Sequence, residues 1–254
     1  MTHRFIHCLK SGVPLNENSI KTDKNQLVAL VTGAARGIGK AVADELRERG
    51  VTVIGTSRLG NSSPIQEHTP AGPDPVQLDV RNEAQVLETF KYVTKVYGRI
   101  DILVNNSGVG TFCPITETSL EAFKEMIDTN LTGAFLCSRE AMKLMKARAG
   151  GRIINIGSIA DHSALSGNGG YSASKFGLRG LNGVINEEGK LSQIRATLVS
   201  LGATYTEIWK SRPEFSEKDM LSVSEVAQLI SDIAVKPLSM RIDEVRLSPS
   251  KGIL

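Results

Sequence analysis

The sequence has few of the residues that mark several classes of protein. Its three cysteines, Cys8, Cys113 and Cys137, are odd in number and lack metal-ligand spacing, which argues against a disulfide framework or a zinc site. Reduced cysteines fit the cytosol, so a cytoplasmic location is expected. No apolar stretch approaches the roughly 20 residues of a membrane helix. The net charge of +3 comes without a basic block, so neither nucleic acid nor a membrane is an expected partner.

What the chain does have is the composition of an ordinary globular protein. Its 254 residues are 41% hydrophobic and 22% charged, enough to bury a real core. Chains of this length with an α/β pattern commonly form one domain, which we expect over residues 26–254. Residues 1–25 are expected to be a flexible or loosely packed extension. Because no acidic residue precedes Glu17, an organellar-targeting segment is the alternative.

Short apolar runs alternate with segments of helical periodicity. Strands are predicted at residues 27–31, 51–56, 75–80, 102–105, 152–156, 196–200 and 244–247, and helices at 40–48, 83–97, 118–147, 171–188 and 222–234. The third helix opens on a capping box from Thr118 to Glu121, and we expect a distortion where Asn130 and Gly133 interrupt it. The Ser-, Pro- and Gly-rich stretch 61–75 is expected to be a loop. This alternation predicts a doubly wound, mostly parallel sheet flanked by helices, in a single domain.

Tyr171 and Lys175 are the most informative pair of residues. A spacing of four places both side chains on one helix face, one turn apart. An ammonium beside a phenol favours the phenolate, so we expect the pKa of Tyr171 to fall below its ordinary value of about 10. A tyrosine tuned in this way can exchange a proton with a reacting oxygen. The same spacing occurs on many solvated helix faces, so the neighbouring motifs must show whether this pair is catalytic.

A glycine-rich turn, running from Thr32 to Gly39, separates the first strand from the first helix. Gly33, Gly37 and Gly39 let the backbone approach a ligand closely. The helix start offers free N–H groups and a positive end, which together suit a pyrophosphate; the alternative is a merely tight turn. Ser158 follows the apolar run 153–156, which predicts a buried strand that ends at a site.

The motifs follow one another in the order glycine-rich turn, Leu78-Asp79-Val80, Asn105-Asn106-Ser107-Gly108, Asn130, Ser158, and Tyr171 with Lys175. In this combination the chain resembles the short-chain dehydrogenase/reductase family, from about Gln26 to the C-terminus. The resemblance implies a Rossmann-type fold and hydride transfer with a nicotinamide cofactor. It does not identify the substrate.

The resemblance implies four catalytic residues, Asn130, Ser158, Tyr171 and Lys175. Tyr171 would be the general acid in reduction and the general base in oxidation, while Lys175 would lower its pKa and bind the nicotinamide ribose. Ser158 would donate a hydrogen bond to the substrate oxygen. Asn130 would hold the helix distortion and a water that links Lys175 to solvent. Taken singly, each residue also fits a structural role.

The end of the second strand bears on the choice of cofactor. It carries Ser57-Arg58, where an enzyme that prefers NAD usually has a carboxylate for the ribose 2′-hydroxyl. With Arg36 in the glycine-rich turn, two guanidinium groups suit a 2′-phosphate, so we predict NADP. Either arginine could instead be a solvated surface residue. The resemblance implies further cofactor contacts from Ile38, Asp79, Val80, Asn106, Ser107, Gly108, Tyr171, Lys175, Gly202, Thr204 and Thr206.

Some positions depart from the family pattern. Ser107 replaces the usual alanine, and its hydroxyl needs a partner. Leu201 replaces the usual proline before the turn near the nicotinamide, which leaves an N–H and more backbone freedom. Trp209 and Phe215 fall where the family has its substrate lid, and core packing is the alternative. His162 could face substrate, although an exposed loop histidine is the plainer interpretation.

The combined prediction is an NADPH-dependent reductase of a ketone or aldehyde, with no metal. A 3-oxoacyl thioester reductase is the alternative enzyme. The lack of an arginine near Asn186 argues mildly against it, although Lys143, Lys146 and Arg179 remain as surface cations. An NADP-binding regulatory protein without turnover is the alternative from another class.

The resemblance also implies a dimer or tetramer that pairs through the long central helix. An apolar face of that helix could serve there or could equally be core, and it consists of Ala134, Phe135, Leu136, Met142 and Met145.

Overall fold

The computed structural model describes residues 26–60, 75–148, 150–206 and 216–252. Its strands are β1 (Val28–Thr32), β2 (Thr52–Ser57), β3 (Val76–Gln77), β4 (Ile102–Asn105), β5 (Gly151–Ile156), β6 (Ile194–Leu201) and β7 (Glu244–Leu247). Its α-helices are α1 (Gly37–Glu48), α2 (Glu83–Tyr97), α3 (Leu120–Ile127), α4 (Gly133–Lys146), α5 (Gly169–Gly189) and α6 (Val223–Ala234). The predicted order of elements is confirmed. The extension 1–25 and nearly all of the loop predicted at 61–75 lie outside the described residues.

The described strands form one sheet in the order β3-β2-β1-β4-β5-β6-β7, and every neighbouring pair is parallel. The strands are apolar runs because the sheet is covered on both faces, and β1 and β4 are buried at every position. The doubly wound parallel sheet is therefore confirmed. Strand order reverses between β1 and β4, and in such sheets ligands bind outside the carboxyl ends of the strands at that point.

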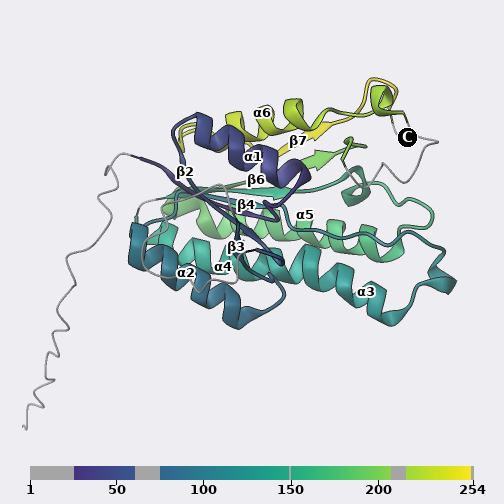
Figure 1. Cartoon of the computed structure of the whole chain (residues 1–254), viewed down its shortest axis with the longest axis horizontal. Coiled ribbons are helices and arrows are strands. Elements are labelled where there is room, and N and C mark those ends of the chain that lie inside the picture. Colours follow the sequence, from purple (N-terminus) through teal and green to yellow (C-terminus); the bar gives the residue numbers. More distant parts are fainter. Residues whose placement is uncertain (1–25, 61–74, 149, 207–215, 253–254) are drawn as a thin grey trace, which may run out of the picture.

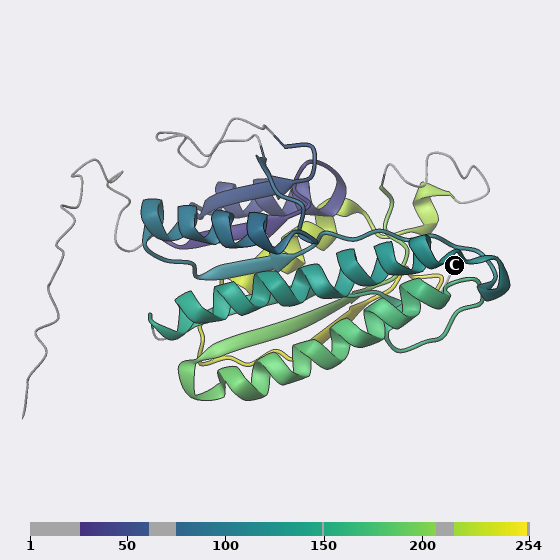
Figure 2. The ribbon, with the colours of Figure 1, turned by 90° about the horizontal axis from the view of Figure 1, so that it is seen from below.

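Helices cover both faces of the sheet (Figure 1). α1 and α6 pack together on one face, where Leu46 and Ile230 are completely buried. α2, α4 and α5 lie on the other face, over a core that includes Phe90 and Met145. α4 and α5 run side by side (Figure 2). α1, α2 and α6 thus each bury an apolar stripe in the core.

The long helix predicted at 118–147 is interrupted, as expected. α3 passes into a π-helical turn, Asp128–Thr132, and then into α4. Its N-terminal cap differs by one residue from the prediction. The hydroxyl of Ser119, not of Thr118, accepts from the N–H of Ala122 at 3.1 Å. The Thr118 hydroxyl points instead to the preceding turn, where it donates to the carbonyl of Pro114 at 3.1 Å.

The third strand is shorter than predicted, since only Val76 and Gln77 pair with β2. The N–H of Leu78 still bonds to the carbonyl of Ser57 at 2.8 Å. Asp79 then turns the chain, because its carboxylate accepts from the N–H of Arg81 at 3.0 Å. Local bonds of this kind compete with sheet pairing.

The apolar face that could have served for pairing is mostly core. Ala134, Leu136, Met142 and Met145 are buried within the subunit, and Phe135 is the exposed member of the set, at 43%. The reason is that α4 packs against α2, α5 and the strands beneath it. Within the described residues, no helix is long and apolar enough to cross a membrane.

Candidate active site

The predicted site residues follow the carboxyl ends of neighbouring parallel strands. Gly33 follows β1, Asn106 follows β4, Ser158 follows β5 and Gly202 follows β6. Parallel strands bring these loops to one edge of the sheet, so residues far apart in the sequence meet there.

Ser158 is held by a short turn directly after β5. Gly157 makes the last strand-like bond, from its N–H to the carbonyl of Val199 at 2.9 Å. Ser158 then caps the 3-10 turn Ile159–Asp161. Its hydroxyl accepts from the N–H of Ala160 at 3.2 Å, and its own N–H donates to the Asp161 carboxylate at 3.0 Å. These bonds place the Ser158 hydroxyl, and the residue is buried.

Tyr171 and Lys175 lie in the first turns of α5, as their spacing predicts. Nζ of Lys175 is 5.6 Å from the centre of the Tyr171 ring. It also donates to the carbonyl of Ile156 at 2.7 Å, which brings the lysine to the strand end that precedes Ser158. Phe112 packs edge-on against the Tyr171 ring, with the ring centres 5.4 Å apart. Ser158, Tyr171 and Lys175 therefore converge.

Burial dominates the titration of the two groups on α5. It raises the pKa of Tyr171 above its ordinary value of 10.0, hydrogen bonding from Ser158 lowers it, and the charge of Asp161 raises it further. Burial lowers the pKa of Lys175 to about 8, and Asp161 opposes that change. The prediction that the pKa of Tyr171 falls is therefore wrong, because the pKa is raised. Lys175 loses its proton before the phenol does, so no ammonium remains to stabilise the phenolate.

Asn130 lies in the π-helical turn and uses its whole side-chain amide. Oδ1 accepts from the N–H of Val109 at 2.8 Å, while Nδ2 donates to the carbonyl of Val109 and to Ser174 Oγ, both at 2.9 Å. A β-carbon on Gly108 would lie 3.4 Å from Asn130 Oδ1 and 3.9 Å from Lys175 Nζ, so these residues meet. The predicted helix distortion at Asn130 is confirmed, and its link to a water stays a prediction.

Two glycines of the glycine-rich turn, Gly33 and Gly39, are packed too closely for side chains. Gly33 has a φ of +68°, and a β-carbon there would lie 2.9 Å from Nδ2 of Asn106. A β-carbon on Gly39 would overlap the same amide and the carbonyl of Gly33. Gly37 has a φ of +55°, and its nearest outside neighbour is Thr206, 3.6 Å from an added β-carbon. Ile38, in the first turn of α1, packs against the core below.

The N-terminus of α1 is open to a ligand. Arg36 is the N-cap residue, its side chain makes no capping hydrogen bond, and the first turn carries no acidic residue. Uncapped N–H groups at the positive end of a helix attract an anion such as a phosphate. The close-packed glycines and this helix start therefore fit the pyrophosphate of a dinucleotide.

Asn106 and Ser107 support the glycine-rich turn through Thr32. The N–H groups of both residues donate to the Thr32 hydroxyl at 3.0 Å, and Nδ2 of Asn106 donates to the Thr32 carbonyl at 2.9 Å. Sequence reasoning missed Thr32, although a polar residue ending an apolar strand was a signal. These bonds clamp the loop after β4 to the loop after β1.

The end of β2 fits a phosphorylated ribose. Among the described residues, the buried hydroxyl of Ser57 has no hydrogen-bond partner. Arg58 is half exposed and lies 3.6 Å from Glu125 on α3. The N–H of Ala34 donates to the carbonyl of Thr56 at 2.8 Å, so the turn that carries the exposed Arg36 adjoins this strand end. β2 ends without a carboxylate, so the polar groups here suit an anion.

Asp79 and Val80 are engaged by other parts of the protein. Arg81 donates to the Asp79 carboxylate from Nη2 at 2.6 Å and from Nε at 2.9 Å. These hydrogen bonds lower the pKa of Asp79. Val80 is 4% exposed and packs against Gly133 at the start of α4. A cofactor contact from Val80 must therefore use its backbone, because its side chain belongs to the core.

The turn after β6 is more ordered than its departure from the family pattern suggests. Leu201 is buried and pairs with Leu247 of β7, and the N–H of Gly202 donates to the carbonyl of Leu247 at 2.7 Å. The extra backbone freedom expected from leucine is therefore removed by sheet pairing. Thr204 is buried and donates to the carbonyl of Gly202 at 3.1 Å. Trp209 and Phe215 lie outside the described residues.

Sequence reasoning also missed Asp161, which is completely buried beside Ser158. The available signal was an acid three residues after a serine that ends a strand, the pattern of a capping box. His162 is not the exposed loop residue expected, because its Nδ1 lies 2.8 Å from the Asp161 carboxylate. Arg179 is not a free surface cation either, since it pairs with Glu244 at 2.6 Å and with Asp161 at 3.4 Å.

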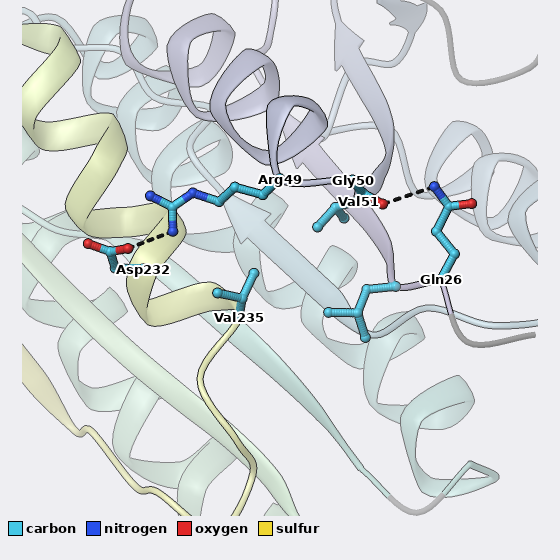
Figure 3. Close-up of a pocket in the computed structure, with 7 residues that line it drawn as sticks. Gln26, Arg49, Gly50, Val51, Asp232 and Val235 are labelled. Carbon is cyan, nitrogen blue, oxygen red and sulfur yellow. Dashed lines mark hydrogen bonds and ion pairs between the residues drawn. The ribbon is translucent and has the colours of Figure 1, made fainter. Parts of the chain in front are cut away.

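One hollow lies at the other end of the sheet, where Gln26 precedes β1 and Val51 precedes β2 (Figure 3). Its charged side chains form an ion pair, in which Arg49 lies 2.6 Å from Asp232. The amide of Gln26 donates to the carbonyl of Gly50 at 2.9 Å. The hollow is remote from the converging residues described above, and we assign it no ligand.

Comparison with known proteins agrees with this geometry. The family model for short chain dehydrogenases matches residues 27–217. The chain is 33% identical to 3-oxoacyl-(acyl-carrier-protein) reductase FabG of Escherichia coli (strain K12), over 72% of this chain and 76% of that protein. It is 29% identical to the sepiapterin reductase of Chlorobaculum tepidum, over 89% of this chain and 97% of that protein.

Among solved structures, the chain is similar to an alcohol dehydrogenase from the archaeon Thermococcus sibiricus complexed with 5-hydroxy-NADP. The TM-score is 0.78 and the identity 26%, covering 89% of this chain and 97% of that one. The parallel seven-stranded sheet agrees with this structural similarity. The chain belongs to the short chain dehydrogenase family of oxidoreductases.

Proposed function

We propose that this protein is an NADPH-dependent reductase that converts a ketone or aldehyde to an alcohol. The observation that carries the proposal is the convergence of Ser158, Tyr171 and Lys175 at one edge of the sheet, beside an open glycine-rich turn. When bound, NADPH would supply the hydride; the chain's own residues would bind, orient and protonate.

Tyr171 is proposed to give its proton to the carbonyl oxygen as that oxygen gains charge. The position of Tyr171 beside Lys175 and Ser158 supports this role, and its phenol is protonated at neutral pH, as a proton donor must be. Ser158 would donate to the same oxygen and stabilise the developing charge. Lys175 would return the proton to Tyr171, through a water that Asn130 would hold and that links Lys175 to solvent. Their shared neighbourhood at Gly108 supports that assignment.

We propose NADP rather than NAD as the cofactor. The arginines at positions 36 and 58, the unpartnered Ser57 hydroxyl and the lack of a carboxylate at the end of β2 support a 2′-phosphate. The similarity to a dehydrogenase complexed with 5-hydroxy-NADP supports it too. Arg58 would exchange its contact with Glu125 for the phosphate, which costs little because both side chains are about half exposed.

A 3-oxoacyl thioester reductase is the second candidate, favoured by the 33% identity to FabG. Two features speak against a carrier-bound substrate. Asn186 is buried and bonds to the backbone of Ala196 at 2.8 Å. Arg179 is held by Glu244 at 2.6 Å and by the buried Asp161 at 3.4 Å, so it is not a free cation for an acidic carrier.

The test is NADPH consumption over a panel of ketones, aldehydes and 3-oxoacyl thioesters, with NADH alongside. Tyr171→Phe is expected to lower kcat by about 10²–10⁴-fold. Tyr92→Phe, on α2 and remote from the site, is the matched control and should retain activity. Preference for acyl thioesters would select the second candidate. NADPH binding without turnover on any compound would contradict the enzyme proposal and favour a regulatory protein.

We also propose that the protein assembles as a homodimer or homotetramer. Phe176 and Val184 on α5 are 44% and 52% exposed, and Phe135 on the neighbouring α4 is exposed as well. An added β-carbon on Gly180 or Gly183 would meet nothing within 4 Å, so this helix face is smooth. Such a face suits a second copy of the chain. A monomer mass by light scattering at micromolar protein would contradict the proposal.

A cytoplasmic location remains part of the proposal. The thiols of Cys113 and Cys137 are free, which suits a reducing compartment.

A further inference from the structure

Asp161 carries a completely buried carboxylate that the proposed proton transfer does not use. Oδ2 accepts from the N–H of Ser158 at 3.0 Å and from the hydroxyl of Ser200, on β6, at 2.6 Å. Oδ1 lies 2.8 Å from Nδ1 of His162 and 3.4 Å from Nη1 of Arg179. One carboxylate thus joins the Ser158 turn, β6 and the catalytic helix α5.

The surroundings are shaped to accept this side chain. A β-carbon on Gly157 would overlap Oδ2 of Asp161, so a residue other than glycine at 157 would displace the carboxylate. Burying an ion costs several kcal/mol unless it is paired and hydrogen-bonded. Here Arg179 supplies the charge, and Glu244 holds Arg179 through bonds of 3.0 and 2.6 Å. A turn that only needed a cap could have used a neutral residue.

The charge of Asp161 faces the proposed catalytic pair. Among the described residues, the titratable and charged groups around it are His162 on its own turn, and Tyr171, Lys175 and Arg179 on α5. Glu244 on β7 acts through Arg179, and β6 contributes the neutral Ser200. Asp161 raises the pKa of both Tyr171 and Lys175. A fixed negative charge at this point therefore favours the protonated form of each group.

We propose that Asp161 is a positioning residue of the active site: it fixes Ser158 through its backbone and holds a negative charge beside Tyr171 and Lys175. The proposal rests on the proposed reductase function. It assigns Asp161 no contact with substrate and no proton transfer of its own. Its effects should therefore be on kcat and on the pH profile, rather than on cofactor affinity.

The test is Asp161→Asn, which keeps the shape and removes the charge. Oxidation of the alcohol needs deprotonated Tyr171, so the rise of its rate with pH should move to lower pH, by about one unit. The kcat of reduction should fall about 10-fold because a neutral amide oxygen anchors the Ser158 backbone more weakly than the carboxylate does. The Kd for NADPH should stay within about 2-fold.

Asp101→Asn is the matched control. Asp101 also binds a backbone N–H, that of Val28 at 2.8 Å, and an arginine, Arg99 at 2.6 Å, but it precedes β4 at the other end of the sheet. It should lower thermal stability as Asp161→Asn does, and leave the pH profile unchanged. If the Asp161 variant loses stability but keeps the wild-type profile, Asp161 is only structural and the proposal is overturned.

A readout without turnover separates this proposal from the reductase proposal. NMR titration of ¹³C-labelled tyrosines, with Tyr171 assigned by its absence in Tyr171→Phe, follows the phenol directly. The Tyr171 pKa should fall in Asp161→Asn and rise in Arg179→Met, which leaves the Asp161 charge uncompensated. Arg179→Met also serves if Asp161→Asn does not fold. Shifts of equal sign in the two variants, or no shift, would overturn the proposal even in a protein with no measurable turnover.

Discussion

The residues around Tyr171 and those around Arg58 belong to two strand ends of one sheet, with β1 and β4 between them. Around Tyr171, Ser158 and Lys175 are buried, and the Ser158 hydroxyl and the Lys175 amine are hydrogen-bonded to the backbone. Around Arg58, the side chains are partly exposed, and Glu125 lies 3.6 Å from Arg58 and 3.8 Å from Arg81 across the surface. The first region is fixed by packing and the second by weak ion pairs.

Because the two regions differ in burial, we expect them to contribute differently to rate and to cofactor binding. Buried dipoles and charges act strongly because little solvent screens them, so the Tyr171 region should control rate. Exposed arginines act weakly on stability and remain able to turn toward a ligand. The Arg58 region should therefore control which nicotinamide cofactor binds, and should affect rate little.

The largest effect is expected at Ser158. Ser158→Ala should lower the kcat of reduction by about 10²–10³-fold, because a preorganised donor to the developing oxyanion is lost. The Kd for NADPH should change less than about 2-fold, since the glycine-rich turn is untouched. Single-turnover kinetics and cofactor fluorescence titration measure the two quantities separately.

Ser163→Ala is the matched control for this change. Ser163 follows the same turn, and its N–H bonds to the carbonyl of Ile159 whatever its side chain. It should retain wild-type kcat. An equal loss of rate in both variants would mean that the turn as a whole, and not the Ser158 hydroxyl, sets the activity.

The same difference explains what the sequence could predict. The sheet and its order of elements follow from apolar runs and glycines, and the spacing of four places Tyr171 and Lys175 on one helix face. Their convergence with Ser158 was implied by the family resemblance. The strand over 75–80 was predicted too long because Asp79 and Arg81 form a local turn. That competition between side chain and sheet is invisible in periodicity.

The electrostatics of the site could not be predicted from spacing. The spacing of four between Tyr171 and Lys175 indicated contact, but the direction of the Tyr171 pKa shift depends on burial and on Asp161, which comes from another element. Likewise Arg179 was taken for a surface cation because its partner Glu244 is 65 residues away. Ion pairs between residues far apart in the sequence could be identified only from the structure.

An intermediate effect is expected at the arginines. Arg36→Ala with Arg58→Ala should weaken NADPH binding about 30-fold and leave NADH binding within about 2-fold, because charge-assisted bonds to the 2′-phosphate are lost. Titration with both cofactors gives the ratio directly. An equal loss for NADPH and NADH would contradict the assignment of these arginines to the 2′-phosphate.

Two single variants sharpen this result. Arg148→Ala removes a surface guanidinium that bonds to the carbonyl of Gly98, and should change neither affinity. Glu125→Gln removes the carboxylate that faces Arg58 and Arg81. It should strengthen NADPH binding about 2-fold to 5-fold, since Arg58 no longer exchanges an ion pair for the phosphate.

The smallest effect, and one of opposite sign, is expected on stability at Lys175. Its pKa of about 8 lies below the ordinary 10.5, so the folded state carries a cost for the buried ammonium at neutral pH. Lys175→Met removes that cost and the bond to the Ile156 carbonyl, so the net gain should be about 1–2 kcal/mol, or several degrees in Tm. The variant should be inactive as a reductase.

The pH dependence distinguishes this gain from a general effect of methionine. The ammonium cost is fully present below pH 8 and disappears as pH rises toward 10.5, where the unfolded chain also loses the proton. The stability advantage of Lys175→Met should shrink over the same range. Lys143→Met, at a lysine paired with Glu140 on the surface, should give no gain at any pH. If the stability gain of Lys175→Met does not vary with pH, it comes from apolar packing of the methionine and not from removal of the buried charge.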